Sequence, residues 1–286
     1  MPLATGGGTD LAARVVGATL SERLGQSVII ENRTGAGGVI GVEAASKAPA
    51  DGYTIVVGSS TTMAANIFLY KNLPFDPMRD FVPLAMIGTI DFGITVPASM
   101  PVSNLQEFIA RAKAQPGKMS YGFGSSAALL CGEMLKATAG VDIVKVPYKG
   151  TPQSLADLAA DRIQLVCEPF GTSMPFIKAG KLKALAVTNT MRNSLAPEVP
   201  TTEEAGLPMM HVTWAAFFAP AKTPADALAK LRTELVIAMK TPGVPERIRD
   251  TGFVPTPLDA EALGAQHRAE VARLEKLVKE AGIRPE

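Results

Sequence analysis

The sequence has few of the side chains on which catalysis and metal binding commonly depend. Its 286 residues include only two histidines, two cysteines and one tryptophan. The His-Glu-x-x-His, Cys-x-x-Cys and Gly-x-Ser-x-Gly patterns are all missing. The sequence therefore lacks the catalytic motif of a serine hydrolase and the metal-binding motifs of a zinc enzyme. We therefore expect no enzyme, no catalytic residue, no metal and no cofactor.

Long apolar runs and clustered charges are also missing. No stretch approaches the roughly 20 apolar residues that span a bilayer. The first residues, Met-Pro-Leu-Ala-Thr-Gly, show neither the basic segment nor the apolar core of a signal peptide. The 28 basic and 27 acidic residues give a net charge of +1, without a run of Lys and Arg. We expect no nucleic-acid partner, because such binding needs clustered cations.

The two cysteines, Cys131 and Cys167, lie 36 positions apart without metal-ligand or redox spacing. Both have apolar neighbours in the sequence. This context favours buried, inert thiols over a disulfide.

Apolar runs alternate with segments of helical periodicity, which predicts an α/β fold on a mostly parallel sheet. The composition, 47% apolar and 19% charged, suits packed cores, and the length suits about two domains. Ser103 and Gln106 resemble a capping box for a helix over 105–114. The expected strands are 27–30, 54–58, 84–96 (interrupted by Gly88, Asp91 and Gly93), 120–123, 143–146, 163–167, 184–187 and 212–219.

A glycine-rich segment, Gly35–Gly41, follows one expected strand and opens a helix, as a dinucleotide-binding loop would. The Gly-x-Gly-x-x-Gly pattern fails, however, because Ile40 occupies the place of the third glycine. A nicotinamide-dependent oxidoreductase therefore stays an alternative with a weak signal.

Three turns rich in glycine or hydroxyl groups carry a stronger signal. Residues 6–9 read Gly-Gly-Gly-Thr, residues 59–62 read Ser-Ser-Thr-Thr, and residues 122–126 read Gly-Phe-Gly-Ser-Ser. Each lies where a strand or loop leads into a helix. Unpaired N–H groups at helix N-termini attract anions, and glycine lets a ligand approach the backbone. The pattern predicts that a small anion binds at these turns.

Around these turns the chain resembles the substrate-binding receptors of tripartite tricarboxylate transporters, the Bug family. The matching blocks include Gly-Gly-Gly-Thr-Asp-Leu-Ala-Ala-Arg at 6–14, Glu-Asn-Arg-Thr-Gly-Ala-Gly-Gly at 31–38 and Val-Pro-Tyr-Lys-Gly at 146–150. Further blocks lie at 50–54, 73–77, 80–84, 177–188 and 199–208. The resemblance runs nearly from end to end.

The resemblance implies a type II periplasmic-binding-protein fold with two α/β lobes, a cleft between them and two hinge crossings. We expect lobe 1 at 1–96 plus 217–286 and lobe 2 at 97–216. The implied function is capture of a small carboxylate by lobe closure and its delivery to the membrane subunits of a carrier. A ligand sensor that serves a signalling partner is the alternative. The implied location is the periplasm, and we expect a monomer.

The family pattern also implies the residues that bind the ligand. Glu168 stands where the family often has Asp, and it meets either a ligand amino group or a backbone amide. Lys149 either pairs with the far carboxylate of the ligand, makes a cross-lobe contact or is solvated. The full set is Ala4, Thr5, Gly6, Gly7, Gly8, Thr9, Ser59, Ser60, Thr61, Phe123, Gly124, Ser125, Ser126, Tyr148, Lys149 and Glu168.

Some residues depart from the family pattern. Leu129 and Met63 replace frequent histidines, and Phe123 adds an aromatic ring. These changes predict a more apolar pocket, which favours an aromatic or longer aliphatic acid over citrate-like ligands. Only residues 1–4 remain of the first strand that the resemblance implies. We expect this to destabilise lobe 1 and expose a neighbouring strand edge.

Overall fold

The chain folds into two compact units and passes between them twice. The computed structural model describes residues 1–3 and 5–280. Unit 1 comprises residues 1–89 and 213–286, and unit 2 comprises residues 90–212. The predicted division into two lobes at residues 96 and 216, which would move as rigid bodies, stays a prediction.

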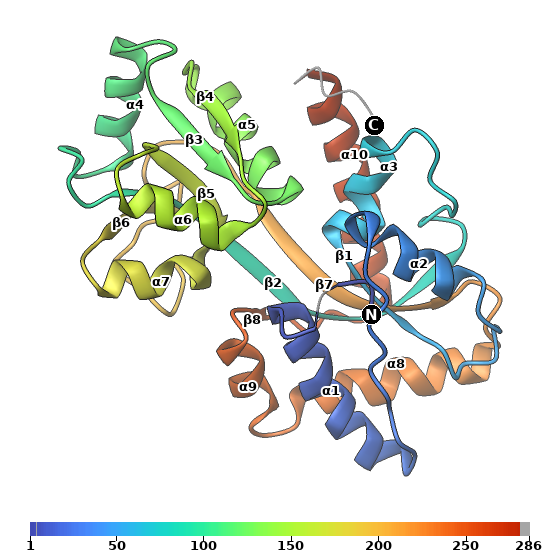
Figure 1. Ribbon diagram of the computed structural model, residues 1–286. Helices are drawn as coiled ribbons and strands as arrows, with labels where there is room; N and C mark the ends of the chain where they lie inside the picture. Colours follow the sequence, from blue (N-terminus) through green and yellow to red (C-terminus); the bar gives the residue numbers. More distant parts are fainter. Residues whose placement is uncertain (4, 281–286) are drawn as a thin grey trace. The chain divides into compact units, whose positions relative to one another are not determined.

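Unit 1 is an α/β layer structure on a sheet in the order β1-β7-β2 (Figure 1). β1 (Val56–Ser59) pairs antiparallel with β7 (Val212–Pro220), and β8 (Val254–Pro255) pairs with β2 (Phe81–Pro97). Its helices are α1 (Gly8–Leu24), α2 (Val39–Ser46), α3 (Asn66–Leu69), α8 (Ala225–Lys240), α9 (Val244–Asp250) and α10 (Ala260–Glu280). Two short turns of helix, η1 (Ala36–Gly38) and η2 (Thr61–Ala65), complete it.

Unit 2 is a second α/β layer structure, on the order β6-β2-β5-β3-β4. The elements not yet given are α4 (Leu105–Ala114), β3 (Ser120–Phe123), α5 (Ser126–Ala139), β4 (Val144–Pro147), α6 (Thr151–Ala159), β5 (Leu165–Pro169), α7 (Phe170–Lys178) and β6 (Leu182–Val187). β3 pairs parallel with β4 and β5, whereas β2 pairs antiparallel with β5 and β6. The prediction of a mostly parallel sheet was wrong: the pairing is mixed.

β2 runs unbroken for 17 residues and contributes to the sheets of both units. The prediction of a strand interrupted at its glycines was therefore wrong. Glycine serves close packing here instead of a turn. A Cβ on Gly93 would lie 2.6 Å from the ring of Phe170, and one on Gly88 would overlap the carbonyl of Val254.

Alternate residues of β5 face opposite helices, as the period of a strand requires. Leu165 and Cys167 lie in the core cluster that α4 and α5 share, and Val166 lies in the cluster with α6. Glu168 also faces α6, because its carboxylate accepts bonds from Thr151 and Ser154. This alternation aims one acidic side chain at the start of α6.

Cys131 on α5 and Cys167 on β5 form a disulfide with a Cα–Cα distance of 5.9 Å. The prediction of unpaired thiols was wrong. Both residues are fully buried, as their neighbours in the sequence suggested. The apolar neighbours predicted that both cysteines are buried, but not that α5 packs on the face of β5 from which Cys167 projects. This packing brings the two residues to a distance that a disulfide can span.

Residues 27–30 were predicted to form a strand, and they do not. Within residues 1–3 and 5–280 they have no strand partner, and the side chain of Ile29 is 84% exposed. An apolar run gives a strand only where a neighbour accepts its backbone bonds.

Candidate functional site

The first predicted turn leads into α1 in unit 1. Thr5, Gly6 and Gly7 are exposed, and Gly6 has a φ of +80°, which favours glycine. Gly7 is the N-cap, and no side chain caps the helix. The first amides of α1, from Gly8 and Thr9, therefore have no intrahelical partner. Ala4 was also predicted to bind ligand, and it lies outside the described residues.

Asp10 holds this turn from behind. Its buried carboxylate accepts bonds from the Gly6 amide (2.9 Å), from Arg14 Nε (3.0 Å) and from Asn32 Nδ2 (2.9 Å). Burial alone would raise the pKa of Asp10, but the bonds from Arg14, Gly6 and Asn32 outweigh it and lower the pKa to about 2. Asp10 thus stays ionised, and the Gly6 amide is already used.

The second predicted turn follows β1 in the same unit. Ser59 and Thr62 bond to each other: the Ser59 amide donates to Thr62 Oγ1 (2.9 Å) and the Thr62 amide to Ser59 Oγ (3.2 Å). In the described part of the chain, the hydroxyls of Ser60 and Thr61 have no such bond. These two hydroxyls of the turn are therefore not committed to another described residue; Ser60 is buried and Thr61 is half-buried.

A single π-helical turn, η2, continues from these residues, and π-helical turns often occur at functional sites. His267 on α10 lies 2.7 Å from the Met63 carbonyl in this turn, so its Nε2 must donate. Burial lowers the pKa of His267, which favours the neutral ring. His267 therefore holds η2 in place as a neutral donor.

The third predicted turn joins β3 to α5 in unit 2. Ser125 caps α5, because its hydroxyl accepts from the Ala128 amide at 3.1 Å. Ser126 begins the helix and is half-buried. Gly124 packs against the backbone of the next turn: a Cβ there would overlap Gly150 and the Thr151 amide. Only glycine fits at position 124.

Glu168 is fully buried and joins two turns of unit 2. Its Oε1 accepts from the Gly124 amide (2.8 Å) and from Ser154 Oγ (3.1 Å), and its Oε2 accepts from Thr151 Oγ1 (2.8 Å). Burial raises the pKa of Glu168, although these three bonds oppose the shift. Of its two predicted roles, the structure contains the bond from a backbone amide.

The other residues predicted in unit 2 lie around this turn. The Tyr148 amide donates to the Phe123 carbonyl (2.9 Å), and the Tyr148 hydroxyl donates to Asp157 (3.0 Å). Phe123 is half-buried, and Lys149 is exposed. Unit 2 therefore brings Phe123, Gly124, Tyr148 and Glu168 together by direct bonds. Convergence with the turns of unit 1 on one ligand stays a prediction.

The sequence reasoning missed several residues that build these turns. Asp10, Thr62, Thr151 and His267 each bond to a predicted residue or its neighbour. Only Asp10, which directly follows the first turn, and Thr62, the last residue of the second turn, had a signal in the sequence. Thr151 and His267 are brought in by the tertiary fold.

The glycines of the rejected dinucleotide loop are explained by packing. A Cβ on Gly38 would lie 2.5 Å from Thr62 Cγ2, and one on Gly37 would lie 2.7 Å from the Tyr70 hydroxyl. The Gly37 carbonyl also accepts a bond from Asn66 Nδ2 at 3.2 Å. These glycines allow η1 to approach the segment from η2 to the end of α3.

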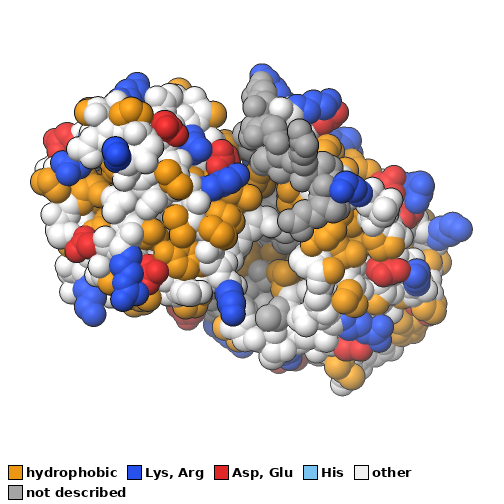
Figure 2. Space-filling view, turned by 45° about the horizontal axis from the view of Figure 1, so that its top comes forward, with side chains coloured by type: hydrophobic (Ala, Val, Ile, Leu, Met, Phe, Trp, Pro, Cys, Tyr) orange, Lys and Arg blue, Asp and Glu red, His pale blue; other side chains and the backbone are white. Residues whose placement is uncertain are grey.

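The face shown in Figure 2 mixes acidic and basic side chains, without one continuous field of either sign. Within the described residues, no helix combines the length and the apolar character needed to cross a membrane. No group of three or more His, Cys, Asp or Glu side chains in that part of the chain is placed to hold a metal ion.

Comparison with known proteins identifies the family to which the chain belongs. Residues 12–283 match the tripartite tricarboxylate transporter family receptor. Protein BugT of Bordetella pertussis is 32% identical over 289 residues, which cover 99% of this chain and 88% of BugT.

Solved structures give the same result. An R. palustris protein with adipate is 35% identical, with a TM-score of 0.87 over 100% of this chain and 96% of its own. MatC from Rhodopseudomonas palustris, with bound malate, is 30% identical, with a TM-score of 0.80 over 97% of this chain and 96% of its own. Periplasmic binding protein BugD is 31% identical, with a TM-score of 0.82 over 100% of this chain and 97% of its own. These proteins are solute-binding receptors and not enzymes, and this chain belongs to the tripartite tricarboxylate transporter receptor family.

Proposed function

We propose that this receptor captures a small carboxylate with the turns that open α1 and α5, together with the hydroxyls of Ser60 and Thr61. The bound adipate and malate of its relatives support a carboxylate ligand. Helix N-termini supply unpaired amides and the positive end of the helix dipole. Both turns belong to separate units, so a ligand held by both would favour lobe closure.

One observation carries this proposal. In each unit a buried carboxylate accepts a hydrogen bond from a glycine amide of the turn: Asp10 accepts from Gly6, and Glu168 accepts from Gly124. The amides that follow, at Gly8 and Thr9 and at Ser126 and Ala127, are the ones that helix geometry leaves unpaired. The turns are thus fixed from behind while their next amides stay available to an anion.

The side chains beside the α5 turn support an aromatic or longer aliphatic acid. Phe123 and Leu129 are half-buried and pack against the core of unit 2. Phe123 ends β3 just before the turn, and Leu129 lies on α5 three residues after Ser126. Met63 was expected to contribute as well, but it is fully buried in the core of unit 1. The argument for an apolar pocket therefore depends on Phe123 and Leu129.

Calorimetry with adipate, terephthalate and citrate tests both the site and the ligand class. We expect Ser126→Trp to abolish binding of the best ligand, because the indole covers the first amides of α5. Gln153→Trp, on the exposed first turn of α6 in the same unit, is the matched control and should bind normally. Unchanged affinity in Ser126→Trp refutes the site, and much tighter binding of citrate refutes the ligand class.

We further propose that the receptor works as a monomer in the periplasm and delivers its ligand to membrane subunits of a tripartite carrier. The disulfide supports this location, because disulfides persist in oxidising compartments. Fractionation of cells that express the natural gene, followed by mass analysis of the exported protein in its oxidised form, tests the location. Recovery of the protein only from the cytoplasm would contradict it.

A further inference from the structure

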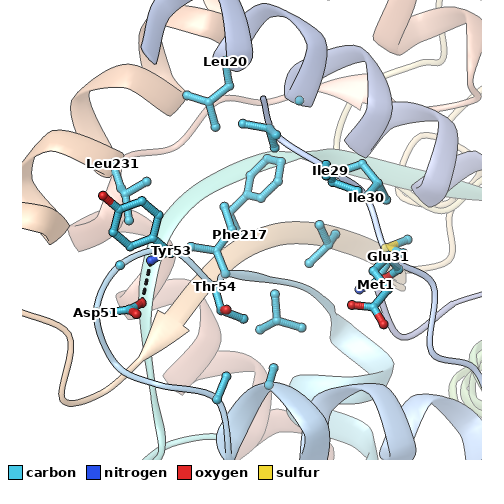
Figure 3. Close-up of a pocket in the computed structure, with 18 of the residues that line it drawn as sticks. Met1, Leu20, Ile29, Ile30, Glu31, Asp51, Tyr53, Thr54, Phe217 and Leu231 are labelled. Carbon is cyan, nitrogen blue, oxygen red and sulfur yellow. Dashed lines mark hydrogen bonds between the residues drawn. The ribbon is translucent and has the colours of Figure 1, made fainter. Parts of the chain in front are cut away.

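Two aromatic side chains of β7 lie on the side of the unit 1 sheet where Met63 of η2 is buried. Trp214 and Phe218 belong to the same core cluster as Met63. Phe217 projects from the other face of the strand, into the cavity shown in Figure 3. None of the predicted ligand-binding residues lines that cavity. The side chains that can act on the second predicted turn therefore lie on the Trp214 face of β7.

His267 of α10 packs against both of these aromatic rings. The centre of its imidazole lies 5.7 Å from the ring centres of Trp214 and of Phe218, at interplanar angles of 73° and 71°. Edge-to-face packing against two rings fixes the orientation of the imidazole. In that orientation Nε2 lies 2.7 Å from the Met63 carbonyl. The core of unit 1 therefore sets the direction of this hydrogen bond.

Met63 is the middle residue of η2, and its neighbours restrict its movement. Its side chain is fully buried, and a Cβ on Gly58 would overlap it. Further along the turn, the Asn66 amide donates to the Thr61 carbonyl, which is the five-residue bond of a π-helical turn. The Asn66 side chain donates in turn to the Gly37 carbonyl at 3.2 Å. The backbone that carries Thr61 is thus held by contacts from several elements.

The π-helical hydrogen bonding of η2 determines where the residues before it point. A π turn spans one residue more than an α turn, and π-helices are rare, so contacts with other elements must favour this one. α3 follows η2 directly. Relaxation of η2 to α-helical bonding would therefore move Thr61 by one position relative to α3. One position on an α-helix corresponds to a rotation of about 100°, which would turn the Thr61 hydroxyl to another side.

We propose that His267 is a positioning residue of the ligand site: its hydrogen bond to Met63 keeps η2 in the π-helical form and so holds the Thr61 hydroxyl where a carboxylate can accept from it. Thr61 is the half-buried hydroxyl of its turn, whereas those of Ser60 and Thr62 belong to buried residues. This assignment rests on the proposed function, because it needs Thr61 to bind the ligand.

Four variants of the full chain separate a positioning role from a merely structural one. His267→Phe keeps a ring against Trp214 and Phe218 but has no donor, and His267→Gln restores an N–H donor. Thr61→Val replaces only the hydroxyl by a methyl group. Leu274→Ala is the matched control, because Leu274 is buried on the same helix and its loss destabilises α10 without removing a side-chain donor.

Calorimetry uses whichever of adipate, terephthalate and citrate binds the unsubstituted receptor most tightly, well below the Tm of every variant. We expect Thr61→Val and His267→Phe each to weaken binding by about tenfold or more, because a hydrogen bond to a charged group is lost. His267→Gln should recover most of the affinity, and Leu274→Ala should lower Tm but leave the affinity unchanged. In the Thr61→Val background, His267→Phe should add little, since both changes remove the same bond.

The outcomes distinguish this proposal from the proposed function. Unchanged affinity in Thr61→Val would refute the ligand contact of Thr61 and, with it, that part of the proposed function. Weaker binding in Thr61→Val together with unchanged affinity in His267→Phe would overturn the positioning role alone, as would losses that add fully in the double variant.

Hydrogen exchange tests the role of His267 without any ligand. His267→Phe should speed amide exchange at 61–66 by about tenfold or more compared with Leu274→Ala, because only the first change removes the bond to η2. Equal exchange of this segment in the two variants would overturn the proposal.

Discussion

Reducing the disulfide between Cys131 and Cys167 should destabilise unit 2 strongly and unit 1 little. The bond closes a loop across 36 positions within unit 2. The chain-entropy relation for a loop of that size gives about 13 cal/mol/K, or about 4 kcal/mol at 25 °C. For a unit of this size, such a loss corresponds to a fall in Tm on the order of 10–20 °C. Cys167 directly precedes Glu168, which accepts a hydrogen bond from Gly124 in the turn before α5, so reduction should loosen this turn as well.

The chain offers separate probes for the two units. Trp214 is the single tryptophan and is buried in unit 1, so its emission follows that unit. Hydrogen exchange of peptides from 120–147 follows unit 2. A Cys131→Ala/Cys167→Ala variant controls for the reductant and should not respond to it. Reasoning from loop entropy is refuted if reduction, verified by a gain of two hydrogens in mass, leaves the exchange of unit 2 unchanged.

Three further predictions concern the residues behind the turns. Asp10→Ala should lower the free energy of unfolding by about 3 kcal/mol, because it leaves the Gly6 amide and Arg14 without their acceptor. Since the pKa of Asp10 is lowered to about 2, the unsubstituted protein should lose a similar stabilisation as the pH falls from about 4 toward 2, and an unfolding free energy that stays constant over this range would contradict the prediction. Burial raises the pKa of Glu168, so its ionisation destabilises the fold as pH rises above the ordinary pKa of 4.5 toward the folded value. Glu168→Gln should remove that slope in urea titrations at several pH values. Glu168→Ala should cost about 3 kcal/mol below pH 4.5, where the carboxyl is protonated in both states, and less at higher pH. Gly124→Ala should lower the free energy of unfolding by about 2 kcal/mol and weaken ligand binding, because the added methyl overlaps Gly150. Gly150→Ala is the control and should be tolerated, because its methyl meets no atom closer than 3.7 Å. Equal Tm values for the two variants would show that the contact at Gly124 is not tight.

Much of the fold was readable because local signals and tertiary packing agree. The helix over 105–114 and the strand over 120–123 have the predicted bounds. The first shows helical spacing of Leu105, Phe108, Ile109 and Ala112, all of which are buried. Its cap was assigned to the wrong pair: Asn104 accepts from the Glu107 amide, one position after the predicted Ser103 and Gln106. Adjacent polar residues leave the choice of cap open until the backbone is known.

The features that the sequence did not yield depend on neighbours distant in the chain. The disulfide needs α5 above β5, and β2 stays continuous because Gly88 and Gly93 lie against Val254 and Phe170. The run at 27–30 has the composition of a strand but lacks a partner. The composition of a segment indicates whether it could form a strand, but a neighbouring strand must supply the hydrogen bonds before it does.

The candidate site shows the same division. The glycines of its turns were recognisable in the sequence, whereas the buried side chains that hold those turns in place were not. Each unit places a buried carboxylate behind its glycine turn, but the two are balanced differently. Asp10 has the guanidinium of Arg14 within 3.0 Å, so its charge is neutralised locally. Among the described residues Glu168 has only neutral donors, two of them in the first turn of α6, where the positive end of the helix dipole stabilises a negative charge. The turn of unit 1 therefore depends on a carboxylate that stays charged down to about pH 2, whereas the carboxylate behind the turn of unit 2, whose pKa burial raises, takes up its proton first as the pH falls.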